Sequence, residues 1–268
     1  IMFNNQIQMS VSDYSNYNGP GATPPYFIPA YDDIYENNTL YCLADSQICM
    51  RQFHCYSATP VDFGTYSGNR YHNPYNELSL MVYNLNFGGR KWYTLERWQA
   101  DRHEDLNSTR SNMRLSSHRT TVELTSNLTP SGLFNTNLGG WQNNLWPTNG
   151  LLTWTNTQLD QGAMRVNLPN NTIYPTLSTR SPEIFSLQSQ QWYRLGFSLI
   201  SPNLGDMIIG IKGQSQLNNP YTLFERQVPF SPERRDLTLY FQAPITDQAT
   251  VQIINQYTEP VYTIDNIS

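Results

Sequence analysis

Short apolar runs that alternate with polar positions dominate this chain, and Gly, Pro and Asn interrupt them at close intervals. This pattern is typical of β-strands that are buried on one face. Apolar residues spaced for a helix are sustained only over about two turns, at Tyr93–Ala100. The sequence therefore predicts an all-β protein. The clearest expected strands are Leu78–Tyr83, Trp192–Ile200, Met207–Ile211, Leu237–Phe241 and Thr250–Ile254.

The two halves of the chain differ in the spacing of these runs. From about Leu133 onward, strands recur with short turns, as they do in a β-sandwich. Before that point strands are sparse and the loops are long, and the stretch Tyr14–Asp33 is crowded with aromatic residues and prolines. We therefore expect two domains, residues 1–127 and 128–268.

A faint repeat runs through the first half. The segment Asn4–Gln8 is echoed by Asn37–Tyr41 and more weakly by Asn76–Leu80. Such "Asn-Asn-apolar-x-apolar" segments, together with Trp98-Gln99 and the following Glu104–Ser108, resemble right-handed parallel β-helix proteins of the pectate-lyase kind. Those proteins usually have Gly where this chain has Arg102 or His103. The resemblance implies that residues 1–127 form a short right-handed parallel β-helix.

Four landmarks in the second half resemble jelly-roll carbohydrate-binding modules, in the order in which those modules carry them. The resemblance implies a jelly-roll β-sandwich over residues 128–268, and it implies that Trp141, Tyr193 and Phe197 lie in the core, as Trp98 does in the first half. The landmarks are Asn137–Trp141, Gln191–Ser198, Phe241–Pro244 and Tyr262–Ile267.

The same resemblance implies a structural calcium ion. In jelly-roll modules its ligands include the Asp of the last strand, which Asp265 matches. The second ligand position falls at Asn135, where the family usually has Glu. An amide oxygen can bind calcium, but one negative charge is lost.

The small number of charged residues and the negative net charge restrict the kinds of partner that the chain can bind. Only 14% of the residues are charged and the net charge is −5, with Lys91 and Lys212 as the two lysines. Nucleic acid requires a basic surface that displaces counterions, so it is not expected as a partner, and a polyanionic sugar is disfavoured for the same reason. No apolar run is long enough to span a membrane. A neutral partner fits best.

The three cysteines, Cys42, Cys49 and Cys55, leave at least one thiol unpaired within the chain. Buried thiols, one local disulfide and, least favoured, a metal site stay open. Because the chain begins abruptly at Ile1, we interpret it as a piece of a larger polypeptide.

Catalysis is not expected. A glycosidase needs two carboxylates that face each other across a cleft. The clustered Glu96, Asp101, Glu104 and Asp105 are better explained as a solvated turn and a helix cap. A lyase base would have to come from Arg90 or Lys91, beside Gly88-Gly89.

Stacking on exposed rings and hydrogen bonding to hydroxyls are the interactions that a neutral sugar offers. We expect the segment 66–75, with its Gly, Asn and Pro residues, to expose its tyrosines on a loop. The resulting candidate sugar contacts are Tyr66, Asn69, Arg70, Tyr71, Tyr75, Glu77 and Trp92, with Trp146 and Trp154 as a competing site.

The resulting hypothesis is a non-catalytic, secreted or cell-surface bacterial module. It would bind a neutral plant cell-wall polysaccharide, with β-1,4-xylan favoured by resemblance to modules of gut or soil bacterial xylanases, and would target a linked glycoside hydrolase to it. Two alternatives stay open: a β-helix polysaccharide lyase or hydrolase fragment with an appended sugar module, and a structural domain of a surface adhesin.

Overall fold

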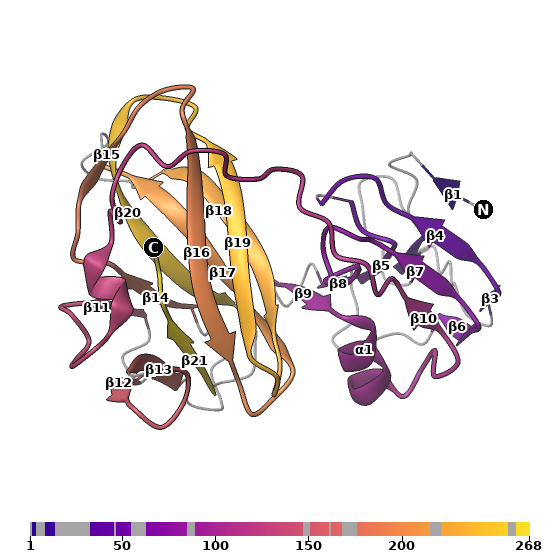
Figure 1. Ribbon diagram of the computed structural model, residues 1–268. Helices are drawn as coiled ribbons and strands as arrows, with labels where there is room; N and C mark the ends of the chain where they lie inside the picture. Colours follow the sequence, from indigo (N-terminus) through magenta and orange to yellow (C-terminus); the bar gives the residue numbers. More distant parts are fainter. Residues whose placement is uncertain are drawn as a thin grey trace, which may run out of the picture. The chain divides into compact units, whose positions relative to one another are not determined.

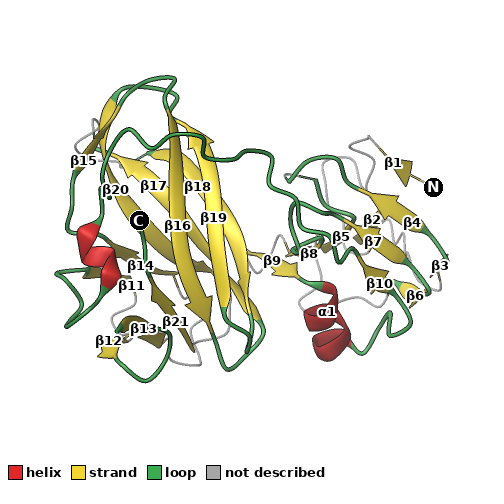
Figure 2. Ribbon diagram, viewed as in Figure 1, coloured by secondary structure: helices red, strands yellow, loops and turns green. Residues whose placement is uncertain are grey.

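A computed structural model describes residues 2–3, 9–13, 33–45, 47–54, 63–84, 89–146, 151–160, 162–167, 176–214, 221–256 and 261–268. The chain divides into two compact units, Ile1–Ser117 (unit 1) and His118–Ser268 (unit 2). Both are built mainly of strands (Figures 1 and 2), which confirms the all-β prediction. The domain boundary expected after residue 127 falls inside unit 2 and stays a prediction. Within the described ranges, no helix is both long and apolar enough to cross a membrane.

Unit 1 consists of short strands and one helix. Its elements are β1 (Met2–Phe3), β2 (Met9–Asp13), β3 (Asp33–Glu36), β4 (Thr39–Tyr41), β5 (Met50–His54), β6 (Gly64–Ser67), β7 (Arg70–His72), β8 (Leu80–Asn84), β9 (Gly89–Tyr93), α1 (Leu95–Arg102) and β10 (Thr109–Arg110).

Parallel pairing organises these strands. The chain passes through β3, β4 and β5 and then lays β6, β7 and β8 beside them in the same order. The strands β1 and β2 extend two of these sheets on one side, and β10 extends the β4–β7 sheet on the other. Only β9 runs antiparallel to its neighbour among the described pairs of this unit. The pass through β3, β4 and β5 and the pass through β6, β7 and β8 therefore each add one strand to each of three sheets.

The register of this repeat differs from the one expected from the sequence. The segment at residues 37–41 does not align with 76–80, because Leu40 lies beside Tyr71 and Leu80 lies beside Met50. An asparagine stack fixes the observed register: the backbone N–H and the side-chain amide of Asn38 both donate to Oδ1 of Asn69, at 3.0 and 3.2 Å. The first segment of the expected repeat, Asn4–Gln8, lies outside the described residues, as does most of Tyr14–Asp33.

The predicted short helix is confirmed as α1. Thr94 caps its first turn, since its hydroxyl accepts the N–H of Arg97 at 3.2 Å. The helix ends at His103, which adopts the left-handed conformation (φ 56°) common after a helix C-terminus. Leu95 and Trp98 are buried, so one side of this helix anchors it to unit 1.

Unit 2 is a sandwich of two antiparallel sheets. One sheet has the order β11-β14-β20-β17-β18 with β15 beside β20, and the other has the order β12-β13-β21-β16-β19. Its elements are the 3₁₀ helix η1 (Pro130–Leu133), β11 (Gln142–Trp146), β12 (Leu151–Thr155), β13 (Ala163–Asn167), β14 (Thr176–Arg180), β15 (Phe185–Leu187), β16 (Trp192–Ile200), β17 (Gly205–Gly213), β18 (Thr222–Phe230), β19 (Arg235–Gln242), β20 (Asp247–Gln256) and β21 (Val261–Asp265).

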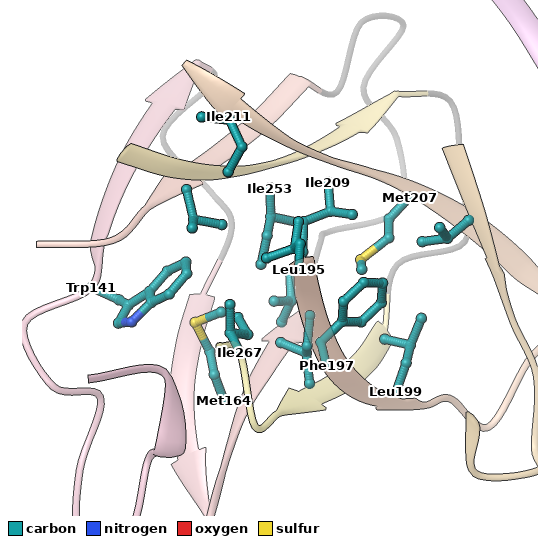
Figure 3. Close-up of a cluster of buried hydrophobic side chains, with 14 of the residues drawn as sticks. Trp141, Met164, Leu195, Phe197, Leu199, Met207, Ile209, Ile211, Ile253 and Ile267 are labelled. Carbon is teal, nitrogen blue, oxygen red and sulfur yellow. The ribbon is translucent and has the colours of Figure 1, made fainter. Parts of the chain in front are cut away.

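Alternate positions of the long strands fill the space between the sheets. Leu195, Phe197 and Leu199 on β16 meet residues such as Met207 and Ile209 on β17, as Figure 3 shows. Successive side chains of a strand point to opposite faces, so the positions between them face outward. The five strands expected from the sequence are confirmed, because each coincides with or overlaps β8, β16, β17, β19 or β20.

The landmarks expected in the core are buried. Trp98 in unit 1 and Trp141 and Phe197 in unit 2 have almost no exposed surface, and Tyr193 packs against the unit 2 core. The indole N–H of Trp141 donates to the hydroxyl of Ser131 at 3.0 Å, so the ring is both buried and hydrogen bonded.

The beginning and end of unit 2 are joined. The N–H of Ile267 donates to the carbonyl of Gly132 at 3.0 Å. A Cβ atom on Gly132 would come within 2.4 Å of the carbonyl oxygen of Ile267, so only glycine permits this approach. The last residue, Ser268, exchanges two backbone hydrogen bonds with Gly196 on β16. These hydrogen bonds attach the C-terminal segment to η1 and to β16.

We expect Cys42 and Cys49 to form a disulfide under oxidising conditions. Their Sγ atoms lie 3.4 Å apart and both side chains are buried. Closing so short a loop would raise the free energy of unfolding of unit 1 by about 2 kcal/mol. Peptide mapping of the air-oxidised protein and denaturant unfolding with and without reductant provide the measurement.

The variant Cys55→Ser is the matched control and should keep both the bridge and its effect on unfolding. Cys42→Ser should lose both. Alkylation of all three thiols in the non-reduced protein would contradict the expectation.

Candidate functional site

Tyr66 and Tyr71 are buried, and the expectation that they lie exposed on a loop is wrong. They belong to strands β6 and β7, with 5% and 0% of their surface exposed. The ring of Tyr66 stacks on Tyr35 with centroids 4.9 Å apart and meets the edge of Trp98. Gly68 and Asn69 form the turn between β6 and β7, so Tyr66 and Tyr71 lie in the strands on either side of it, whereas a second bend follows at residues 73–75.

A buried polar network joins the second tyrosine to the chain after the helix. The hydroxyl of Tyr71 donates to Oδ2 of Asp105 at 2.5 Å, and the side-chain amide of Asn69 donates to Oδ1 at 3.2 Å. The hydroxyl of Ser108 also donates to Asp105. Burial, reinforced by Asp105, raises the pKa of Tyr71 above its ordinary value. Asn69 and Tyr71 are thus brought together as parts of the unit 1 interior.

The other candidates of unit 1 lie nearer the surface. Arg70 is exposed on β7, whereas Tyr75 and Trp92 are half-buried. Glu77 is also half-buried, and Arg110 and Arg114 both contact its carboxylate, Arg110 at 3.5 Å. These contacts occupy the Glu77 carboxylate, which was expected to accept sugar hydroxyls.

Three of the four clustered carboxylates are paired with cations. Glu96 accepts from Arg110 at 2.5 Å, and Asp101 accepts from Lys91 at 3.0 Å. Glu104 lies 3.3 Å from Arg102. Asp105 is buried in the network above, so its expected place on a solvated turn is wrong.

The two tryptophans of the competing site stand in unit 2. Trp154 on β12 is 37% exposed, and its indole N–H donates to the carbonyl of Phe134 at 2.6 Å. That hydrogen bond fixes the ring against the end of η1. Trp146 is the last residue of β11, and its side chain lies outside the described residues.

Asp265 and Asn135 differ in environment. Asp265 on β21 is 1% exposed, whereas Asn135 is exposed in the turn after η1. Burial raises the pKa of Asp265 to about 6, although the N–H of Asn266 donates to its Oδ1 at 2.7 Å and opposes the shift. A bound cation would favour the ionised carboxylate of Asp265. In the described ranges, His, Cys, Asp and Glu side chains form no group of three placed to hold a metal ion. The calcium ion stays a prediction.

A row of polar residues that was not predicted from the sequence lies on the outer face of the β11-β14-β20-β17-β18 sheet. Gln142 lies directly beside Arg180, Arg180 beside Gln252, Gln252 beside Gly210, and Gly210 beside Glu225. Residues paired directly across strands share a face. This polar row therefore crosses all five strands, a span of about 19 Å at the usual strand spacing.

Contacts between side chains hold this row in place. The guanidinium of Arg180 donates to Oε1 of Gln142 at 3.2 Å. At the other end, the ammonium of Lys212 lies 3.5 Å from the carboxylate of Glu225. Gly210 is buried although it has no side chain, so its neighbours cover it. The row thus presents hydrogen-bonding groups with opposite charges side by side, which suits an uncharged, hydroxyl-rich ligand.

A second exposed feature was also missed. Trp192, at the start of β16, is 51% exposed on the outer face of the other sheet. Trp192 has a signal in the sequence, because a core position for Tyr193 makes its neighbour Trp192 point outward. Strand alternation alone, however, does not tell which strands become neighbours.

No protein-family model matches the chain, and no curated protein matches it. Similar solved structures include the N-terminal cellulose-binding domain from Cellulomonas fimi β-1,4-glucanase C, with 14% identity and a TM-score of 0.41 over 53% of this chain and 95% of that one. The CBM22-1 xylan-binding domain from Paenibacillus barcinonensis Xyn10C shows 7% identity and a TM-score of 0.37 over 51% and 88%. A structure described as "CBM4 structure and function" shows 10% and 0.40 over 52% and 97%.

Replacing Tyr71 with Phe should lower the free energy of unfolding by about 1–3 kcal/mol, because it leaves a buried carboxyl oxygen of Asp105 without its donor. Denaturant unfolding measures the loss. Tyr41→Phe is the control. Because Tyr41 is 40% exposed, this substitution should lower the free energy of unfolding far less. An equal effect of the two substitutions would show that the buried hydrogen bond contributes nothing.

Asp265 should make unit 2 less stable as pH rises from about 4 to about 6. Its pKa is raised in the folded protein, so the folded state binds more protons than the unfolded chain in this window. The ionised form is disfavoured by about 3 kcal/mol above the window. Asp265→Asn should therefore flatten this part of the stability–pH curve, measured by denaturant unfolding.

Glu233→Gln is the control for that experiment, because it replaces an exposed carboxylate of the same unit by an amide in the same way. Calcium gives a second comparison at pH 7. An ion bound at Asp265 would stabilise the wild-type chain and not Asp265→Asn. A wild-type curve parallel to that of Asp265→Asn would contradict the raised pKa.

Proposed function

We propose that the protein is a non-catalytic module that binds a neutral plant cell-wall polysaccharide through the polar row of unit 2. The observation that carries the proposal is the row itself: amide, guanidinium and carboxylate groups from β11, β14, β20 and β18, aligned across one five-stranded face with Gly210 of β17 between them. Sugar hydroxyls are donors and acceptors, and a linear glycan would lie along such a row.

The charge balance of the face supports a neutral ligand. Glu225 compensates Lys212, and Arg180 is hydrogen bonded to an uncharged amide. A net charge of −5 over the chain would repel a polyanionic glycan rather than attract it. Trp146, on the same strand as Gln142, is the residue that we propose supplies a stacking ring.

Within this class β-1,4-xylan is the favoured ligand, and a linked glycoside hydrolase is the favoured partner in the parent polypeptide. Both come from the resemblance of the landmarks Asn137–Trp141, Gln191–Ser198, Phe241–Pro244 and Tyr262–Ile267 to jelly-roll carbohydrate-binding modules. Targeting to a wall polysaccharide would require a secreted or cell-surface protein, which is the location that we propose.

We further propose that unit 1 is a portion of a right-handed parallel β-helix. The repeated passage through three strands, each laid parallel to its predecessor, supports this architecture. Its interior is occupied by Tyr66, Tyr71 and the Asp105 network, so we assign the sugar contacts to unit 2.

Alanine at both Arg180 and Gln252 should weaken retention on a xylan affinity gel by about 10- to 100-fold, because each residue offers hydrogen bonds to hydroxyls and one of them is charged. Trp146→Ala should weaken it by about tenfold through the loss of stacking. The measurement is mobility in gels that contain xylan, glucan or pectin.

Arg165→Ala is the matched control, because Arg165 is exposed on β13 of the opposite sheet and should leave retention unchanged. Unaltered retention of the Arg180/Gln252 variant would remove the polar row as the binding site. Release of new reducing ends or unsaturated products from any of these polysaccharides would show an enzyme instead.

A further inference from the structure

The outer face of the β16–β19 pair carries a second group of residues suited to a sugar, on the opposite side of the sandwich from the polar row. Trp192 lies beside Gln242, and Arg194 lies beside Tyr240. Because Tyr193 and Leu195 pack toward the core, these four residues share the outer face. We refer to them as the Trp192 surface.

Aromatic rings gather on this surface. The His118 ring lies 4.1 Å from that of Trp192, tilted by 36°, and 6.2 Å from that of Tyr240. Trp192 nevertheless remains 51% exposed. The Trp192 ring contacts His118 and leaves about half of its surface exposed among polar side chains. A pyranose ring stacks on an aromatic surface of this kind.

The segment 118–124 contacts the same surface. The N–H and hydroxyl of Thr120 each lie 3.2 Å from the hydroxyl of Tyr240. The carboxylate of Glu123 lies 3.0 Å from the guanidinium of Arg194, and both side chains are more than 40% exposed. Every residue of the segment is exposed, and exposed ion pairs contribute little free energy.

Each of these contacts has a counterpart in a sugar. His118 places a flat ring against an indole, Thr120 offers a hydroxyl to a phenol, and Glu123 offers acceptor oxygens to a guanidinium. A glycan chain would present a flat C–H face and many hydroxyls to the same three partners. The segment therefore occupies positions that glycan hydroxyls can take.

We propose that the Trp192 surface is a second binding surface for a neutral glycan chain, and that the segment 118–124 competes with the glycan for Tyr240 and Arg194. The polar row and the Trp192 surface lie on the two outer faces of one sandwich, so a single molecule would bridge two polysaccharide chains. The choice of glycan rests on the proposed function, whereas the existence of the surface does not depend on the polar row.

Titration of the full chain with β-1,4-xylohexaose by calorimetry tests the proposal. We expect two sites per wild-type molecule and one site each for Trp192→Ala and for the Arg180→Ala/Gln252→Ala variant. Trp192→Phe, which retains a ring, is the matched control and should keep both sites, with affinity at the second reduced by less than about tenfold.

The outcomes separate the two proposals. A single wild-type site that Trp192→Ala leaves intact and Arg180→Ala/Gln252→Ala removes would overturn the second surface and keep the polar row. A single site lost only in Trp192→Ala would keep this surface and overturn the polar row. Near-ultraviolet circular dichroism of each variant establishes that the fold is retained.

Loosening the segment tests the competition. Thr120→Ala/Glu123→Gln, introduced into the Arg180→Ala/Gln252→Ala background, should tighten xylohexaose binding by about two- to fivefold, because the lost contacts are exposed and weak. Unchanged or weaker binding would overturn the competition. Turbidity of soluble xylan on addition of the wild-type chain, abolished by Trp192→Ala, would report the bridging.

Discussion

Burial of the alternate apolar residues of β16, β17 and β20 between two sheets is the interaction on which unit 2 depends. Leu195, Phe197, Ile209 and Ile253 are almost fully buried there, and their contacts exclude water from the space between the sheets. Because a strand repeats every two residues, filling the inside turns every other position to the outer face of its sheet. The polar row and the Trp192 surface are both consequences of that constraint.

The interior of unit 1 combines apolar packing with buried polar groups that are hydrogen bonded. Its described interior includes an apolar cluster around Tyr66, Tyr71 and Trp98, but it also holds the amide of Asn69 and the carboxyl of Asp105. A buried polar group is costly unless hydrogen bonds satisfy it. The stack of Asn38 on Asn69 and the hydroxyl of Tyr71 meet this requirement, and they fix the register of the parallel strands at the same time.

The two units therefore use their polar side chains differently. In unit 1 the aromatic and amide side chains that were first candidates for sugar contacts are mostly used in internal packing and hydrogen bonding. In unit 2 the long antiparallel strands place amides and charged groups in rows that the core does not need. Surfaces that are stable without a partner yet rich in hydrogen-bonding groups are the ones suited to reversible binding of a hydroxylated ligand.

The sequence by itself determined the all-β class, the positions of β16, β17, β19, β20 and α1, and the buried landmarks Trp98, Trp141 and Phe197. The strands and the helix depend on local alternation and turn residues, which neighbouring positions encode. The three buried aromatic landmarks follow from the resemblance of their segments to known families. Only the tertiary structure decided that Tyr71 lies inside, that Leu40 pairs with Tyr71 rather than with the 76–80 segment, and that Arg180 and Gln252 stand side by side. Strand pairing joins residues distant in the chain, and a single sequence contains the period of each strand but not the identity of its neighbour.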